Sequence, residues 1–229
     1  MTIKVICRLV ARASCRQHPA GIGQVDGIHR VVNVIGHELR TPVTTVRGLA
    51  ESLAEAPNDH ALADALVRSA ARLERLVDDL LLASGIFTAA PVGDKGDVDL
   101  NDAVRRAGWP AAVEGAATAR ARSESVDRIL EPIIDNARRH GEPLEVRLGD
   151  AGDVVVLDVE SAGPEMGEGD VALLCEPFFR GEAAVMTAPG LGLGLAIART
   201  VARYEGGDVH AHARSGGGLV VRVELPRPS

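Results

Sequence analysis

Residues 28–53 read IHRVVNVIGHELRTPVTTVRGLAESL, and their apolar side chains recur at alternating steps of four and three. That spacing is the heptad seam of a helix that packs against another helix. Residues 62–87 repeat the pattern, and Ala56-Pro57-Asn58-Asp59 between the runs combines a helix stop with two good N-cap residues. The seam positions are Ile28, Val32, Ile35, Leu39, Pro42, Val46, Leu49 and Leu53, then Leu62, Leu66, Ser69, Leu73, Leu76, Leu80, Ala83 and Phe87.

Each run predicts a helix of about 28 residues, or roughly 42 Å at 1.5 Å per residue. Two such helices joined by a short turn form an antiparallel hairpin. Because one hairpin cannot enclose both of its seams, we expect two copies to form a dimeric four-helix bundle. A plain coiled-coil dimerisation hairpin has the same pattern.

Composition excludes several classes of protein. The chain has 229 residues, enough for one large or two small domains, and its 46% apolar content excludes a disordered chain. A net charge of −7 and only 2% aromatic residues argue against a nucleic-acid partner. Cys7, Cys15 and Cys175 form no close pair, which fits a cytoplasmic protein without a disulfide framework or zinc site. No apolar run approaches the ~18 residues of a membrane span.

The pattern changes after residue 87, where the breaker-rich stretch 88–96 predicts a linker. Beyond it the sequence predicts an α/β domain. We therefore expect a lead-in over 1–25, the two-helix domain over 26–88, and the α/β domain over 97–229. The expected helices are 100–107, 124–140 and 195–204, and the expected strands are 144–148, 154–159, 208–214 and 219–225.

The first candidate site lies on the first long helix. His37 is two residues, or about 200°, from the seam residue Ile35, so it points away from the seam, and Thr41 shares its face. An exposed His beside the carboxylate of Glu38 is a possible nucleophile, although an isolated exposed His is usually only a solvated surface residue. Pro42 should kink the helix just past His37.

Two further constellations follow in the α/β part. Asn136 offers an amide oxygen, a ligand type that Mg²⁺ prefers, with Arg139 and His140 beside it. An ordinary helix with a basic last turn has the same composition. The sequence Gly190-Leu191-Gly192-Leu193-Gly194-Leu195 precedes a helix, so its backbone N–H groups suit a phosphate, although a flexible turn is the commoner explanation.

Together these stretches resemble the boxes of bacterial sensor histidine kinases. Residues 36–48 resemble the phosphoacceptor box, and residues 72–81 resemble the second dimerisation helix. Residues 132–140 are similar to the N-box, 176–181 to the F-box, and 190–195 to the second glycine box. The resemblance covers about residues 26–226. It implies an antiparallel two-helix hairpin that forms a dimeric four-helix bundle, followed by an α/β sandwich of the Bergerat (GHKL-type) ATP-binding fold.

The resemblance also implies roles for the residues. His37 would accept the γ-phosphoryl group of Mg²⁺-ATP, with Glu38 as general base, and pass it to an Asp of a response regulator receiver domain. Thr41 would orient water during dephosphorylation of that partner, and Asn136 would bind Mg²⁺. The implied nucleotide contacts are Asn136, Arg139, His140, Ser161, Gly163, Gly190, Gly192, Gly194 and Leu195.

Three residues depart from the family pattern. Ser161 stands where the family has the Asp that reads adenine, Glu165 replaces a Gly, and Pro132 replaces an Asn and is expected to interrupt its helix. Glu160 would point to the opposite face of the strand. These departures favour the alternative of a degenerate scaffold or phosphatase-biased regulator, whereas an unrelated ATPase leaves the His37 box unexplained. No sensor segment is recognisable, so we expect the signal to arrive through another chain or this chain to be unusually short.

Overall fold

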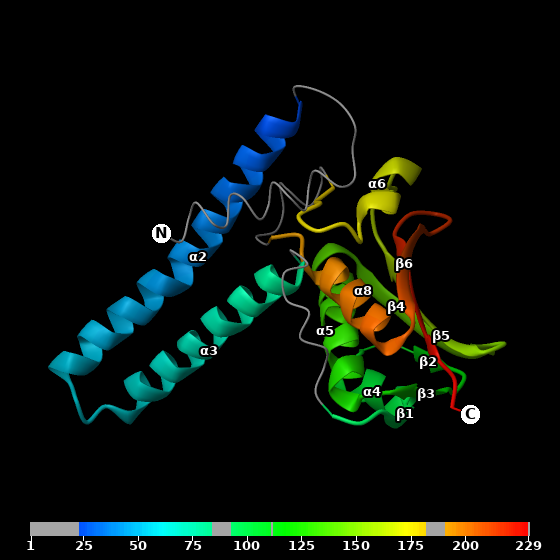
Figure 1. The fold of residues 1–229 in the computed structure, drawn as a ribbon, viewed down its shortest axis with the longest axis horizontal. Helices are drawn as coiled ribbons and strands as arrows, with labels where there is room; N and C mark the ends of the chain where they lie inside the picture. The colour runs from blue at the N-terminus through cyan, green and yellow to red at the C-terminus, as the bar shows by residue number, and fades with distance from the viewer. Residues whose placement is uncertain (1–22, 84–92, 111, 182–190, 229) are drawn as a thin grey trace. The chain divides into compact units, whose positions relative to one another are not determined.

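The computed structural model describes residues 23–83, 93–110, 112–181 and 191–228, which fall into two compact units (Figure 1). The first unit contains the described residues up to 83, and the second contains those from 93 onwards. Within these described ranges, no helix is both long enough and apolar enough to span a bilayer.

The first unit is a hairpin of α2 (Gly23–Glu55) and α3 (His60–Ala83). Asp59 caps α3, because its Oδ1 accepts hydrogen bonds from the backbone N–H groups of Ala61 at 2.9 Å and Leu62 at 3.1 Å. The two predicted helices are thus confirmed over the described residues, although α2 begins at Gly23, before the seam, and the predicted end of the second helix, residues 84–87, lies outside the described residues. Residues 1–22, most of the expected lead-in, lie outside the described residues.

The seam of this hairpin is only partly covered. Ile35 is buried, but every other seam position described from Leu39 to Leu80 is half-buried in the single chain. Val67 is 67% exposed and Val43 is 49% exposed, although both side chains are aliphatic. The first unit therefore leaves much of its apolar surface in contact with water.

The second unit is built on a five-stranded sheet with the order β2-β4-β5-β7-β6. Neighbouring strands are antiparallel except for β2, which runs parallel to β4. β1 and β3 form a separate antiparallel pair, and both precede α5 (Ser123–His140) in the sequence. The strands are β1 (Gly96–Asp99), β2 (Ala112–Glu114), β3 (Thr118–Ala121), β4 (Glu142–Ala151), β5 (Val154–Ala162), β6 (Asp208–Ala213) and β7 (Leu219–Pro226).

Helices cover one face of this sheet, where α5 and α8 lie side by side (Figure 1). The alternate β5 residues Val155, Leu157 and Val159 are buried on this face, as period-two alternation requires. The helices of the unit are α4 (Leu100–Arg106), α5 (Ser123–His140), α6 (Glu168–Leu173) and α8 (Gly194–Glu205). The result is a closed apolar core, in contrast to the open seam of the first unit.

The predicted helices 100–107, 124–140 and 195–204 and all four predicted strands are confirmed. The expectation that Pro132 interrupts its helix is wrong, because α5 continues through it from Ser123 to His140. Proline removes one helical hydrogen bond, to the carbonyl four residues earlier, and the buried α5 residues on both sides of it, Leu130 and Ile133 among them, hold the helix in the core. α2 also contains a proline, Pro42, within its length; the kink expected there stays a prediction.

The single tryptophan, Trp109, belongs to the second unit. It follows α4, is 9% exposed, and donates its Nε1–H to the carbonyl oxygen of Ala112 at 3.3 Å, at the start of β2. Its indole therefore connects the edge of the main sheet to the end of α4.

Candidate functional site

The His37 side chain lies on the open face of α2. It is exposed, whereas Ile35 two residues earlier is buried, so it points away from the seam. The Thr41 hydroxyl donates a hydrogen bond to the His37 carbonyl oxygen at 3.3 Å. A shallow groove on this face is lined by His37, Arg40, Thr41, Thr44 and Thr45. The imidazole is thus open to a second molecule or domain.

Glu38 follows His37 in the chain and is half-buried. Successive helical residues are turned about 100° apart, so their side chains do not face each other. No hydrogen bond joins Glu38 to His37 among the contacts of the described residues. Pro42 deprives the Glu38 carbonyl of its helical donor.

In the second unit, the end of α5 meets the end of β5. A Cβ at Gly141 would lie 2.4 Å from the carbonyl oxygen of Ala162 and 3.2 Å from Ser161 Oγ. A Cβ at Gly163 would lie 3.2 Å from the carbonyl oxygen of His140. Gly141 has to be glycine for this approach, which brings the stretch predicted as the N-box against residues 161–163, where the predicted nucleotide contacts Ser161 and Gly163 lie.

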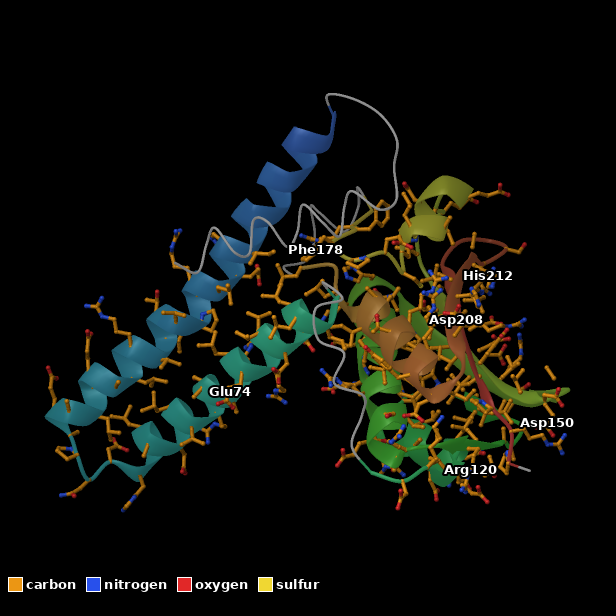
Figure 2. All side chains as sticks on the ribbon, in the orientation of Figure 1. Glu74, Arg120, Asp150, Phe178, Asp208 and His212 are labelled. Carbon is orange, nitrogen blue, oxygen red and sulfur yellow. The ribbon has the colours of Figure 1, made fainter. Side chains whose placement is uncertain are left out.

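The glycine loop closes the other side of the same helix. Gly192 has φ +66°, and a Cβ there would lie 2.4 Å from the carbonyl oxygen of Phe179. The backbone N–H of Phe178, labelled in Figure 2, donates to the Gly192 carbonyl oxygen at 3.0 Å. A Cβ at Gly194 would lie 3.2 Å from Pro132 Cβ of α5. The F-box, the glycine loop and the N-box therefore converge.

α8 begins in this loop with its first turn uncapped. Gly194 is its first residue, Leu193 before it makes no side-chain cap, and Leu195 is buried. The first N–H groups of a helix have no partner within it and carry the positive end of its dipole, so this end suits a phosphate. Gly190 was predicted as a further contact, but it lies outside the described residues, as do residues 182–189.

Basic groups gather at the end of α5. Arg139 Nε pairs with Asp135 Oδ2 one turn earlier at 2.7 Å, so it would have to exchange this partner for a phosphate. The pKa of His140 is lowered, first by partial burial of its imidazole ring and then by the positive charges of Arg180 and Arg139. A phosphate anion beside it would reverse this effect. Arg180 had no role assigned from sequence, since only the fold brings it close to His140.

Asn136 is half-buried on α5, and its amide has no hydrogen-bond partner among the described residues. No cluster of three or more His, Cys, Asp or Glu side chains in the described parts of the chain has the arrangement of a metal site. A single free amide oxygen fits Mg²⁺ that takes most of its ligands from phosphates and water. It does not fit a metal held by protein ligands alone.

The buried polar residue of β5 on the helix-covered face is uncharged. Ser161 is 6% exposed on the helix-covered face, and its hydroxyl has no hydrogen-bond partner within the described residues. Glu160 lies on the opposite face, where Arg147 Nη1 contacts its Oε1 at 2.5 Å, so it cannot replace an acid at Ser161. Glu165 is exposed. The buried polar group left for a ligand here is a neutral hydroxyl.

Comparison with known proteins matches both units to families. Residues 28–86 match the His Kinase A (phospho-acceptor) domain. Residues 121–229 match the ATPase domain of the histidine kinase, DNA gyrase B and HSP90 type. These two matches correspond to the hairpin and to most of the α/β unit.

Whole-chain relatives agree. Sensor protein SphS of Synechococcus elongatus is 33% identical over 226 residues, which is 87% of this chain and 55% of the relative. Sensor histidine kinase GtrS of Pseudomonas aeruginosa is 32% identical over 232 residues, 95% of this chain and 46% of the relative. The chain thus spans about half the length of the curated relatives it matches.

Among solved structures, the histidine kinase ThkA in complex with the response regulator TrrA is similar in fold. Its TM-score is 0.55 at 18% identity, over 90% of this chain and 64% of that one. Fold, site motifs and relatives converge on one assignment. The chain belongs to the bacterial sensor histidine kinases and carries their phosphoacceptor and ATP-binding domains.

Proposed function

We propose that this chain is the catalytic core of a two-component sensor kinase, which phosphorylates His37 from Mg²⁺-ATP and passes the phosphoryl group to an Asp of a response regulator. One observation carries the proposal. The same chain presents an exposed His37 with Thr41 on its face and a second unit in which the uncapped start of α8 at Gly194 packs against Pro132 of α5, one turn before Asn136. Consumption of ATP assigns the reaction to the cytoplasm.

The residues of the second unit fit a nucleoside triphosphate with its metal ion. The N–H groups at the start of α8 would hold phosphate oxygens, and Arg139, His140 and Arg180 would compensate their charge. Asn136 would supply the protein ligand of Mg²⁺, which neutralises charge on the phosphates when bound. Gly163 and Ser161 would face the base.

His37 acts as the nucleophile. Its ring nitrogen forms a bond to the γ-phosphorus as the bond to the β–γ bridging oxygen breaks, and ADP carries away that electron pair. Glu38 takes the imidazole proton after a change of rotamer. Catalysis of this kind depends on positioning and on charge stabilisation rather than on further covalent steps. Thr41 would hold water against the phosphorylated partner in the reverse regulatory reaction.

A matched pair of variants tests the phosphoacceptor. With γ-labelled ATP, we expect acid-labile label on the wild-type chain and none on His37→Gln. His60→Gln, which removes another exposed histidine of the same unit, should label normally. Label that persists in His37→Gln assigns the reaction to another residue.

We propose that two copies associate through the first unit. The half-buried seam and the exposed Val67 and Val77, the latter 41% exposed, provide apolar surface that a second hairpin would cover. The ThkA complex contains a response regulator, which supports a receiver domain as the second partner. Light scattering of the full chain at micromolar concentration should give twice the monomer mass, and a monomer mass contradicts the bundle.

The alternative function is a nucleotide-weak scaffold or phosphatase-biased regulator. The neutral Ser161 where the family has an acid favours it, since a charged acceptor binds an N–H group about twice as strongly as a neutral one. Calorimetric titration with Mg²⁺-ATP distinguishes the two. Absence of binding, together with Thr41-dependent dephosphorylation of a receiver domain, would favour the regulator.

A further inference from the structure

The end of α8 opposite the nucleotide site holds a buried acid. Glu205 is the last residue of α8, and its exposed fraction is 0%. Its Oε1 accepts a hydrogen bond from Arg122 Nη1 at 2.9 Å, and Lys95 Nζ lies 3.4 Å from Oε2. A buried carboxylate costs several kcal/mol in desolvation unless cations compensate it. Arg122 and Lys95 are those cations.

The same two cations also bind backbone. Lys95 Nζ donates to the Glu205 carbonyl oxygen at 2.6 Å, and Arg122 Nε donates to the carbonyl oxygen of Gly93 at 2.6 Å. Gly93 and Lys95 are among the first described residues of the second unit, just before β1. Arg122 immediately precedes α5. Three segments distant in sequence are therefore tied together at one point.

Electrostatics favour a charged cluster. Burial opposes ionisation of Glu205, but the adjacent Ser125 hydroxyl, Arg122 and Lys95 outweigh it and hold the pKa of Glu205 below its usual value. The acid is thus ionised at neutral pH, with one cation from each of two other segments. Lys95 is the member closest to the first unit along the chain, and its side chain is 34% exposed.

α8 connects this cluster to the nucleotide site. Its first residue, Gly194, belongs to the glycine loop, and its last, Glu205, holds the entering chain. Twelve residues of α-helix span about 18 Å and bend little. A shift of the chain at Gly93 to Lys95 is therefore resisted by the helix that also forms the phosphate-binding end of the site.

We propose that Glu205, Arg122 and Lys95 are positioning residues of the kinase, which fix the point where the chain from the His37 unit enters the ATP-binding unit. This inference rests on the proposed phosphorylation of His37. Transfer between two units needs the γ-phosphorus close to the ring nitrogen, and a misplacement of about 1 Å lowers such rates by as much as about 100-fold. A firm entry point reduces the range of placements that the ATP-binding unit samples.

The test uses the full-length chain with Lys95→Met, which keeps the aliphatic stem and leaves the Glu205–Arg122 pair in place. We expect hydrogen exchange over residues 93–99 to accelerate about tenfold and kcat for His37 phosphorylation to fall about tenfold. KM for ATP should stay within about twofold, because no nucleotide contact is changed. Lys95→Arg should restore both values.

Arg120→Met is the matched control. Arg120, labelled in Figure 2, pairs with the exposed Asp97 at 2.9 Å on the β1–β3 pair, so its loss removes a nearby cation without touching the cluster. It should leave exchange at 93–99 and kcat unchanged. Unchanged exchange or unchanged kcat in Lys95→Met overturns the positioning role, as does an equal effect of Arg120→Met. Absence of phosphorylation in the wild type overturns the proposed function instead, and exchange then decides the anchoring alone.

Discussion

The two ends of α8 are built in opposite ways. The first turn has no side-chain cap, contains glycine, and leaves its N–H groups without partners in the helix. The last turn holds a fully buried carboxylate with two cations, and Gly206 closes it in the left-handed conformation at φ +93°. The contrast separates binding from stability within one helix, since the N–H groups at the first end are open to a ligand and the carboxylate at the last end is paired with two cations of the protein.

The largest effect is expected at the last turn of α8, where Glu205 is buried. Glu205→Ala leaves Arg122 and Lys95 with no carboxylate between them, and breaking a buried pair in this way costs about 3–5 kcal/mol. Urea unfolding should show that loss. Glu131→Ala, which changes an exposed carboxylate of α5, should stay within about 0.5 kcal/mol. An equally small loss of stability for Glu205→Ala and Glu131→Ala would contradict a stabilising role of the buried carboxylate.

A change at the open end should weaken ligand binding. Gly192→Ala adds both the strain of a positive φ, about 1–3 kcal/mol, and a Cβ directed at the carbonyl oxygen of Phe179. Calorimetry should show ATP and GTP affinity falling alike by tenfold or more, about 1.4 kcal/mol per tenfold. Gly216→Ala, at φ +82° with no atom within 4 Å, carries only the strain and should bind normally.

A substitution at Ser161, on the side of the site expected to face the nucleotide base, should instead increase ATP affinity. Ser161→Asp replaces a neutral acceptor with a charged one, worth about 1–2 kcal/mol, or roughly a 5- to 30-fold gain in ATP affinity. The gain should grow with Glu165→Gly in the same chain, while GTP affinity changes little. Tight adenine-selective binding by the wild type would instead show that another group reads the base.

The smallest effect is expected just beyond α8, at Asp208, the first residue of β6. Burial raises the pKa of Asp208, labelled in Figure 2, but Arg203, the Val209 N–H and Arg199 outweigh it and lower that pKa from 3.8 to about 2. A depressed carboxyl pKa stabilises the fold above pH 3.8, and this contribution disappears as pH falls through about 2. Asp208→Asn should therefore cost below about 1 kcal/mol at pH 7, as partly exposed pairs do.

Unfolding curves of wild type and Asp208→Asn should converge as the pH approaches 2. A constant difference across that range would show that the side chain contributes through packing rather than through its charge.

The long amphipathic elements were predictable because their apolar periods are local. The heptads of α2 and α3 and the boxes on α5 and α8 are all visible as sequence patterns. The strands β1 to β3 were not predicted, since they have three or four residues each and pair with distant segments. The helix α6, with six residues in a stretch rich in Gly and Glu, was missed for the same reason.

The site residues likewise include some that local sequence patterns predict and some that only the fold brings together. Glycines and Asn136 could be identified from motifs, but the proximity of Arg180 to His140 depends on how the loop after α6 folds back. The Glu205 cluster has no sequence signature, because Lys95 and Arg122 lie 110 and 83 residues away from it. The prediction for Pro132 was wrong because the packing of α5 on both sides of it is a property of the fold.

Trp109 gives the molecule a built-in optical reporter. As the single tryptophan, it lies at the junction of α4 and β2 and is almost fully buried, so its emission should shift to the red only when the ATP-binding unit opens. The hairpin contains no tryptophan, so its unfolding does not change the tryptophan emission. Circular dichroism at 222 nm, in contrast, records the unfolding of both units. Comparison of tryptophan emission with circular dichroism can therefore separate the unfolding of the two units in one unlabelled sample.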